Sequence, residues 1–390
     1  MNLQEKREQL IAEGLCNHCL GRQFARLGTG LENYERGAIL REKDKLTKED
    51  FIRFNIPQSV SLGGDCFLCK GVFNNLDNYI NLVITTLNDY QFNTMLIGTR
   101  PTQEMKKLER SIWDKYGDDY AEPLKSELNR LVGKEVEERL EVGVDYKNPE
   151  ITAVIDIAQE DVKLQIKSLL IYGKYNKYSR ELFQTEWSYL KDSIQEITEV
   201  PFIQYTEAEA SKFHGAGRED ADVRCFGKRE FVLELVNPKK RKVNLTQLQK
   251  QLNQSQAKVE VFNLKITDRE KIKELKEKRV DKTYRALVTL DQKTTQEELV
   301  TLEQIIGTIE QKTPQRVKKS RGNLVRKREI YKIEPELITK RKFELIIKAE
   351  AGAYIKELIS SDEGRTTPSV AEILGCQAKC TKLDVIDIDN

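Results

Sequence analysis

Two pairs of cysteines with the spacing C-x-x-C constrain the fold of this chain more than any other feature of its sequence. "CNHC" contains Cys16 and Cys19, and "CFLC" contains Cys66 and Cys69 much further along the chain. Each pair can supply two thiolates to one metal ion, and two pairs together complete a closed, structural zinc site. The alternative is four separate buried cysteines. A zinc site would tie two distant segments together and would leave no open position for catalysis.

The composition is that of a globular, cytoplasmic protein. Its 390 residues are enough for two or three domains. The sequence contains no run of about 18 apolar residues, the length needed to cross a membrane. It also contains no signal-peptide pattern. We therefore expect a cytoplasmic location and no membrane partner. The two histidines, His18 and His214, exclude a histidine-rich metal centre, and neither is followed by the x-Glu of a zinc deaminase.

Hydrophobic periodicity predicts an α/β region in the first half of the chain. Apolar residues recur at helical spacing from Leu76 to Leu87, and a second helix is expected from Pro123 to Arg139. The stretches "FNTMLIG", "ITAVIDI" and "VKLQIKSLLI" are expected to be strands. The first predicted domain comprises residues 1–187.

The second predicted domain, residues 188–390, has a mixed order of helices and strands. Helices are expected at "SYLKDSIQEI", "DREKIKELKEKR", "TQEELVTLEQII" and "YIKELIS", and strands at "FVLELV", "KVEVFNLKIT", "TYRALVTL" and "KFELIIKAE". This order predicts an α+β fold around a mixed, largely antiparallel sheet.

Local clusters of basic residues are candidates for binding a nucleic acid, because the net charge of +2 offers no general attraction. "YGKYNKYSRE" contains Lys174, Lys177 and Arg180 among tyrosines, and cations with aromatic rings suit phosphates and unstacked bases. The stretch 312–328 has no acidic residue and includes Lys318, Lys319 and Arg321, and "NPKKRK" is a third cluster. The alternative is a solvated charged surface.

The stretch "FHGAGREDADVR" places Asp220 and Asp222 between a glycine-rich turn and an apolar strand. A carboxylate can act as a nucleophile or base only while it is ionised, and a nearby cation is needed to keep a buried one charged. Strand alternation would direct both aspartates to the same side. The alternative is a surface turn of aspartates and arginines.

Three motifs resemble those of pseudouridine synthases, in the order that this superfamily has. "GREDADVR" resembles the Arg-x-Asp signature, "KTYRALV" the second motif and "EAGAYIKELI" the third. "YGKYNKYSRELFQTEW" and "GRTTP" narrow the resemblance to the archaeal and eukaryotic family that modifies the TΨC arm of tRNA. The resemblance covers nearly the whole chain, and it implies an N-terminal α/β THUMP-related domain with a four-cysteine zinc site.

The resemblance also implies the roles of individual residues. Asp220 aligns with the catalytic aspartate, Tyr284 with the tyrosine that stacks on the target base, and Lys356 with its cationic partner. Many relatives have arginine in place of Lys356, and a lysine cannot form a bidentate fork. Arg218 and Tyr354 are expected to help hold the flipped nucleotide. The implied substrate is tRNA at positions 54 and 55, the implied metal is a structural zinc, and no organic cofactor is expected.

Two other functions remain open at this point. A non-catalytic, zinc-containing tRNA-binding protein would keep the cysteines and basic clusters but would give Asp220, Tyr284 and Lys356 no joint role. A methyltransferase or thiolation enzyme needs a phosphate-cradling glycine loop, and no G-x-G-x-x-G follows a strand. A single cleft that contains all three residues would favour the synthase.

Overall fold

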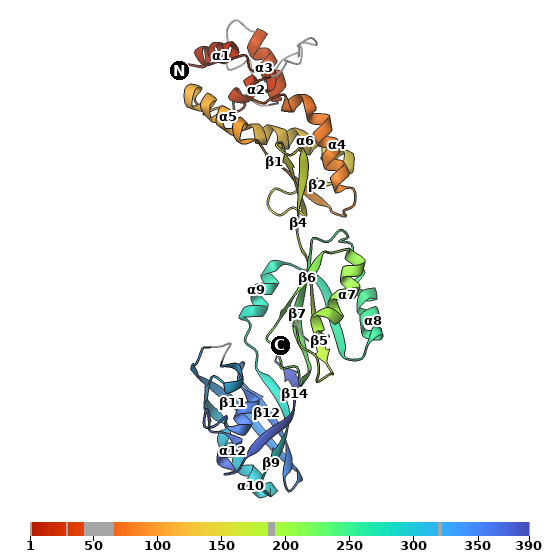
Figure 1. Ribbon diagram of the computed structural model, residues 1–390, viewed down its shortest axis with the longest axis vertical. Helices are drawn as coiled ribbons and strands as arrows, with labels where there is room; N and C mark the ends of the chain where they lie inside the picture. Colours follow the sequence, from red (N-terminus) through yellow and green to blue (C-terminus); the bar gives the residue numbers. More distant parts are fainter. Residues whose placement is uncertain (1, 29, 43–65, 186–191, 319–321, 390) are drawn as a thin grey trace. The chain divides into compact units, whose positions relative to one another are not determined.

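The computed structural model describes residues 2–28, 30–42, 66–185, 192–318 and 322–389. The chain divides into two compact units (Figure 1). Unit 1 comprises Met1–Lys167 and Lys239–Arg241, and unit 2 comprises Ser168–Pro238 and Lys242–Asn390. Among the described residues, no helix has the length and apolar character needed to cross a membrane.

Unit 1 combines N-terminal helices with a small α/β layer. Its helices are α1 (Leu3–Ala12), α2 (Asn17–Gly21), η1 (Arg22–Phe24), α3 (Asn33–Glu42), η3 (Val72–Asn75), α4 (Leu76–Leu87), α5 (Gln103–Tyr116) and α6 (Leu124–Leu140). Its strands are β1 (Thr94–Arg100), β2 (Gly143–Val144), β3 (Ile151–Asp156) and β4 (Asp161–Ile166). The sheet has the order β2-β1-β3-β4, with β1 parallel to both neighbours and β3 antiparallel to β4.

The apolar stripes of α4 and α6 cover this sheet. In α6, Leu124, Leu128, Val132 and Val136 recur every four residues and are all buried, so they form one face of the helix. In α4, the buried residues include Ile80 and Val83. Both predicted helices are therefore present, with bounds within a residue or two of those expected.

Unit 2 is built on one long sheet. Its strands are β5 (Leu169–Lys177), β6 (Ala210–Gly215), β7 (Val223–Val236), β8 (Val259–Thr267), β9 (Lys282–Leu290), β10 (Gly307–Lys312), β11 (Val325–Thr339), β12 (Lys342–Ala349), β13 (Thr366–Thr367) and β14 (Ala378–Ile388). Its helices are α7 (Ile194–Thr206), α8 (Leu245–Ser255), α9 (Arg269–Glu277), α10 (Gln296–Val300), η4 (Thr301–Ile305), η5 (Gln315–Val317), α11 (Ile355–Ser360) and α12 (Val370–Ile373).

The last strand, β14, joins two halves of this sheet. The order is β13-β10-β11-β12-β9-β14-β7-β5-β8, and β6 pairs with β7 at one side. β14 is antiparallel to β9 and parallel to β7, with Leu383 opposite Val223. The other neighbouring pairs in this sheet are antiparallel. The predicted α+β class with a mixed, largely antiparallel sheet is confirmed.

Alternation along β5 explains how helices cover both faces of one half of the sheet. Leu169 and Ile171 pack in the apolar cluster that includes α7 and α8, whereas Leu170 and Tyr172 pack in the cluster that includes α9. α9 lies across the sheet from α7 and α8 (Figure 1). β5 is therefore a buried central strand, which its mixture of lysines and tyrosines does not suggest.

The division between the units falls earlier in the chain than the predicted boundary at residue 187, which itself lies outside the described residues. The stretch "VKLQIKSLLI", expected to be one strand, is divided between β4, which ends at Ile166, and β5, which begins at Leu169. β5 pairs with β7 and β8 and so belongs to unit 2. The predicted helix "SYLKDSIQEI" lies partly outside the described residues, and α7 begins at Ile194 after a capping box formed by Ser193 and Glu196.

Candidate active site

Residues from the three motifs line one cavity of about 320 Å³ in unit 2. Asp220 comes just before β7, Tyr284 lies on β9, and Lys356 lies in the first turn of α11. The cavity lies where β14 joins the two halves of the sheet, since Val223, Leu383 and Val385 also line it. All three residues thus share one cleft, named here the Asp220 cavity, and this arrangement favours a synthase over a protein that only binds RNA. A larger hollow in unit 1, of about 700 Å³, contains none of the three residues.

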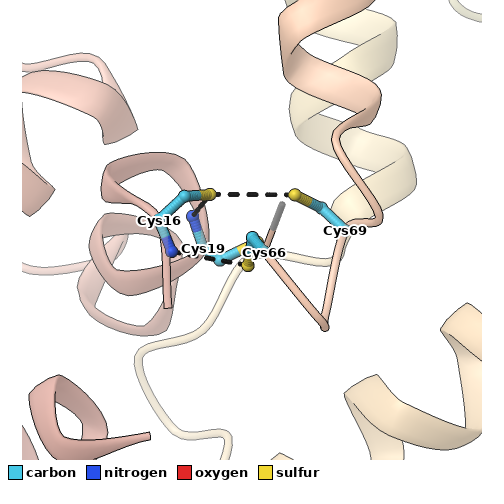
Figure 2. Close-up of side chains that lie close together, drawn as sticks. All are labelled: Cys16, Cys19, Cys66 and Cys69. Atoms are coloured by element: carbon cyan, nitrogen blue, oxygen red, sulfur yellow. Dashed lines mark hydrogen bonds between the residues drawn. The ribbon is translucent and has the colours of Figure 1, made fainter. Parts of the chain in front are cut away.

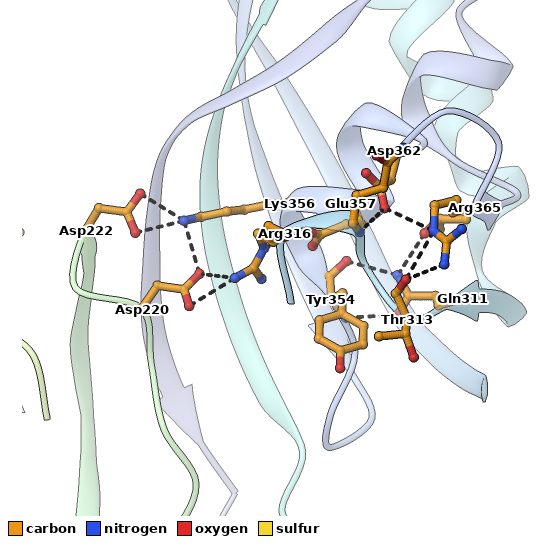
Figure 3. Close-up of polar contacts among 12 residues, drawn as sticks. Asp220, Asp222, Gln311, Thr313, Arg316, Tyr354, Lys356, Glu357, Asp362 and Arg365 are labelled. Carbon is orange, nitrogen blue, oxygen red and sulfur yellow. Dashed lines mark hydrogen bonds and ion pairs between the residues drawn. The ribbon is translucent and has the colours of Figure 1, made fainter. Parts of the chain in front are cut away.

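Lys356 contacts both aspartates of the first motif (Figure 3). Its Nζ lies 3.2 Å from Asp220 Oδ2 and 2.8 Å from each carboxylate oxygen of Asp222. The expectation that strand alternation aligns the aspartates was wrong, because both residues precede β7 in a turn closed by the bond from Val223 N–H to Asp220 C=O. The two carboxylates converge because one ammonium group lies between them.

Arg316 is a second cation at Asp220, and the sequence analysis assigned it no role. Its guanidinium lies 3.0 Å from Asp220 Oδ2, and its Nε donates to Glu357 Oε1 at 2.6 Å (Figure 3). Arg316 was counted only as one basic residue of the stretch 312–328. No signal in a single sequence distinguishes it from its neighbours, because its partners are about 40 and 100 residues away along the chain.

These two cations keep Asp220 ionised. Burial raises the pKa of the Asp220 carboxyl, but the nearby charges of Arg316 and Lys356 and their hydrogen bonds outweigh burial, so the pKa lies below its usual value. The carboxylate is 40% exposed, so it is accessible from the cavity. A charged, accessible carboxylate is the chemical requirement for a nucleophile or base.

A buried group of polar residues supports the turn that carries Asp220. Glu219 forms an ion pair with Arg229 at 2.8 Å and accepts a hydrogen bond from the Tyr175 hydroxyl at 2.9 Å. Arg229 Nη1 donates to the carbonyl of Ala216. Gly217 has a φ of +78°, and a Cβ there would lie 3.1 Å from the Arg229 guanidinium. The glycine of this turn thus permits the main chain to pack closely against Arg229.

Lys177 was predicted to bind RNA, but the structure buries it. Its side chain is fully buried, and its Nζ donates to the carbonyls of Leu182, Asp220 and Ala221 at 2.9–3.0 Å. A phosphate cannot reach this ammonium group. Lys177 instead holds the main chain at Asp220, and it does so because β5 is a central strand and not a surface loop.

Arg180 is likewise occupied by contacts within the protein. Its guanidinium donates to the carbonyls of Asp222 and Leu383 and forms an ion pair with Asp384 at 2.5 Å. Arg224 pairs with the same carboxylate at 2.8 Å. Arg180 therefore connects the Asp222 turn to β14, and the prediction that it binds phosphate conflicts with these contacts.

The other predicted substrate-binding residues line the Asp220 cavity. Tyr284 is largely buried, and burial raises the pKa of its phenol to about 12, so the phenol is neutral at neutral pH. The main chain of Tyr354 is held by the buried side chain of Gln311, which accepts from Tyr354 N–H and donates to Tyr354 C=O. Arg218 is exposed at the edge of the cavity.

The remaining basic residues differ in position. Lys174 is partly exposed on β5, and Lys318 is exposed directly after η5. Lys319 and Arg321 lie outside the described residues. In the third cluster, Arg241 is buried and donates to the carbonyl of Lys167 in unit 1.

The four paired cysteines converge in unit 1 (Figure 2). Their sulfur atoms all lie within 4.8 Å of one another, and those of Cys16 and Cys69 are 3.7 Å apart. A tetrahedral zinc with bonds of about 2.3 Å to sulfur would separate the sulfurs by roughly 3.8 Å. The Arg22 guanidinium, which is fully buried, donates to Cys19 Sγ at 3.6 Å. The arrangement fits a metal ion held by four thiolates.

Comparisons with known proteins agree with both units. A family model described as the C-terminal part of Pus10 matches residues 170–389, and one described as the archaeal Pus10 THUMP domain matches residues 79–156. A tRNA pseudouridine synthase Pus10 from Pyrococcus furiosus is 39% identical over 391 residues, which cover 100% of this chain and 98% of the relative. A relative of the same name from Picrophilus torridus is 36% identical, with 98% of both chains covered. A solved Cbf5–Nop10–Gar1 complex has 17% identity and a TM-score of 0.31, and covers 54% of this chain and 47% of its own.

Proposed function

This chain belongs to the Pus10 family of tRNA pseudouridine synthases and is an isomerase, and we propose that it converts uridines 54 and 55 of the tRNA TΨC arm through a catalytic Asp220. The observation that supports this proposal is the convergence of Asp220, Tyr284 and Lys356 on one cavity. These residues come from three separate motifs.

The proposed reaction needs no second substrate. The bond from N1 of the base to C1′ of the sugar breaks, the base turns, and a bond from C5 to C1′ forms. C5 loses a proton and N1 gains one, so the product has the same composition as the substrate. No electron transfer occurs, which agrees with the expectation that no organic cofactor takes part. The requirement on the protein is a charged group beside the sugar and base.

Asp220 supplies this charged group in our proposal. The target nucleotide must leave its stack to reach the cavity, which costs a few kcal/mol. Tyr284 offsets part of this cost by stacking on the base. Its raised pKa leaves a neutral phenol, which favours stacking over action as a base.

The other residues of the Asp220 cavity hold the nucleotide or the carboxylate. Lys356 keeps Asp220 ionised while Asp222 holds the ammonium group in place. Arg218, exposed at the edge, is suited to a phosphate of the flipped nucleotide, and Tyr354 to the nucleotide itself. Lys174 and Lys318, with Lys319 and Arg321, are proposed contacts to the tRNA backbone. Lys177 and Arg180 are not included, because their contacts lie within the protein.

The two units have different roles in this proposal. Unit 2 carries the reaction, and unit 1, which contains the THUMP match, binds the tRNA in the cytoplasm. Cys16, Cys19, Cys66 and Cys69 hold a zinc ion whose four positions are all occupied by thiolates, so the ion stabilises unit 1 and takes no part in the reaction.

Mapping of pseudouridine in an unmodified tRNA transcript tests the proposal. The wild-type protein should produce pseudouridine at positions 54 and 55. Asp220→Asn preserves size and removes the charge, so it should bind tRNA normally and produce none. Asp222→Asn, which alters only the support of Lys356, should reduce the rate and leave it measurable. Near-normal turnover by Asp220→Asn would contradict the catalytic assignment, and product at other uridines would contradict the proposed positions.

A further inference from the structure

We propose that Arg316 is a positioning residue of the isomerisation, which orients the Asp220 carboxylate by bridging it to the buried carboxylate of Glu357. This inference rests on the proposed function, because it takes Asp220 as the reacting group. It adds a residue from outside the three motifs and assigns it a role distinct from binding tRNA phosphates.

The contacts of Arg316 define the bridge. Its Nη1 lies 3.2 Å from Asp220 Oδ1 and 3.0 Å from Oδ2, so one guanidinium nitrogen faces both carboxylate oxygens. Its Nε donates to Glu357 Oε1 at 2.6 Å. A planar guanidinium that is held at two of its nitrogens has a defined orientation. The orientation of the Asp220 carboxylate is therefore linked to that of Glu357.

Glu357, at the other end of this bridge, has a buried carboxylate. Its carboxylate is only 7% exposed, and Oε2 has no hydrogen-bond partner in the described part of the chain. A buried carboxylate with so few partners depends strongly on a neighbouring cation such as Arg316. Glu357 also follows Lys356 directly on α11, so both cations that contact Asp220 are held by the same short helix.

The segment that carries Arg316 is fastened on both sides of η5. Before it, the guanidinium of Arg365 donates to Thr313 C=O at 2.6 Å, and at its first residue Gln315 N–H donates to Asp362 Oδ2 at 3.1 Å. After it, Leu324 C=O accepts from Thr313 N–H at 2.9 Å, which closes the base of the segment. These bonds direct Arg316 toward Asp220, although the residue lies in a strongly basic stretch.

Lys356 alone leaves the Asp220 carboxylate poorly oriented. Its ammonium group is closer to Asp222, at 2.8 Å, than to Asp220, at 3.2 Å, and it contacts only one oxygen of Asp220. An ammonium group also lacks a fixed plane. Arg316 supplies the contact to the second oxygen, so the two cations together define the position of both oxygens.

Several charged groups surround Asp220, and together with burial they determine how strongly its pKa depends on Arg316. The cations are Arg316 and Lys356 in direct contact with the carboxylate, Lys177 at the Asp220 carbonyl, and Arg218, Arg229 and Lys282 along the cavity; the acids are Asp222, Glu219 and Glu357. Burial raises the pKa of Asp220, and Arg316 is the first of the charges that lower it. Loss of Arg316 should therefore raise this pKa, so that activity is lost at a higher pH when the solution is acidified.

Arg316→Met and Arg316→Lys test the inference in the full-length protein. Both should bind an unmodified tRNA transcript with an affinity close to that of the wild type. In Arg316→Met, the single-turnover rate at saturating tRNA should fall about 10- to 100-fold, the range that misplacement of a reacting group costs. Its acid limb should also move to higher pH. Arg316→Lys keeps the charge but cannot contact both carboxylates, so its acid limb should stay near that of the wild type while its rate remains reduced.

Arg341→Met is the matched control, because it removes an exposed arginine at the turn between β11 and β12, outside the cavity. Its rate and pH profile should equal those of the wild type. Two results would overturn the inference: a wild-type rate and acid limb in Arg316→Met, or a loss confined to tRNA affinity in both Arg316 variants. Asp220→Asn, measured in parallel, separates the two proposals. If it is inactive while Arg316→Met is normal, only the positioning role of Arg316 is lost; activity in Asp220→Asn contradicts the catalytic assignment itself.

Discussion

Five charged side chains alternate in sign through the Asp220 cavity. The series runs from Asp222 through Lys356, Asp220 and Arg316 to Glu357, with each neighbouring pair within 3.2 Å (Figure 3). Each carboxylate thus has a cation beside it, and burial alone does not decide the ionisation of Asp220. Asp222 and Glu357, at the two ends of the series, contact the cations that flank Asp220.

Replacement of Lys356 by methionine should move the acid limb of activity to higher pH. The pKa of Asp220 lies below its usual value partly because of Lys356, so removal of this cation raises the pKa. The carboxylate is then protonated earlier as the pH falls. At neutral pH it stays ionised, since an ordinary aspartate has a pKa near 3.9, and the loss of rate there reports misplacement.

Rates measured from about pH 3 to pH 8, on both sides of the ordinary aspartate pKa of about 3.9, check this expectation. Lys356→Arg serves as the control, because it retains the charge and should keep the acid limb close to that of the wild type. An identical acid limb in Lys356→Met and the wild type would mean that this lysine does not control the ionisation of Asp220.

Lys177→Met should reduce stability and turnover and leave tRNA affinity unchanged. The substitution removes the donor to three carbonyls, and each unsatisfied buried group costs about 1–3 kcal/mol. Turnover should fall because the main chain at Asp220 loses its support. Urea unfolding, a binding titration and the single-turnover rate measure the three quantities.

Lys174→Met provides the matched comparison, because Lys174 lies on the same strand and is partly exposed. It should show the opposite pattern, with weaker tRNA binding and unchanged stability. A loss of tRNA affinity alone in Lys177→Met would restore the interpretation of Lys177 as a phosphate contact.

At the scale of elements, the N-terminal helices of unit 1 are too short to be stable alone. α1 and α3 have ten residues each and α2 has five, whereas isolated helices shorter than about 12–15 residues are marginal in water. Cys16 immediately precedes α2, and Cys66 and Cys69 precede η3. A metal ion at the four thiolates would hold these short elements together.

We predict about one zinc per chain, because four thiolates close a single tetrahedral site. Cys66→Ser should lose the metal and lower the melting temperature of unit 1, since the binding free energy of a structural zinc contributes to folding. Elemental analysis and thermal unfolding with and without a chelator measure both effects. Cys376→Ser, at a partly exposed cysteine of unit 2, should keep the zinc. A metal-free wild-type protein that unfolds as cooperatively as the metal-loaded one would refute the prediction.

At the scale of the whole molecule, attraction to tRNA must come from local charge. The 65 lysines and arginines nearly balance 63 aspartates and glutamates. A near-neutral protein gains its electrostatic affinity for RNA only where basic residues lack acidic neighbours. The stretch 312–328 contains no acidic residue, although Arg316, Lys327 and Arg328 pair with acids of other segments, and it borders the Asp220 cavity through Arg316.

Simultaneous neutralisation of Lys318, Lys319 and Arg321 should therefore weaken tRNA binding and its dependence on salt. Each lost phosphate contact should lower the slope of log K against log salt by roughly 0.7–0.9. A titration series in salt measures this slope. A triple variant at Lys340, Arg341 and Lys342, which removes the same charge from an exposed turn, should leave it unchanged. If the variant at Lys318, Lys319 and Arg321 keeps the same salt slope as this control variant, the basic stretch is only a solvated surface.

Local pattern was enough to predict much of the architecture. The helical periodicity in α4 and α6, the apolar strands of unit 2 and the paired cysteines are all short-range features, and the structure contains each of them. The resemblance of three motifs to those of pseudouridine synthases grouped Asp220, Tyr284 and Lys356, and all three line the Asp220 cavity. Periodicity and motif spacing are properties of neighbouring residues, so a single sequence displays them.

Burial and long-range pairing were decided only by the tertiary structure. Lys177 and Lys174 lie three residues apart in one basic stretch, yet one is fully buried beneath Asp220 and the other is partly exposed. Arg316 and Lys318 lie two residues apart in the same basic stretch, yet Arg316 contacts both Asp220 and Glu357, whereas Lys318 is exposed directly after η5. The strand β5 belongs to unit 2 because β7 and β8 pair with it. Each outcome depends on which distant segment packs against a residue, and the residue's own neighbours in sequence carry no record of that partner.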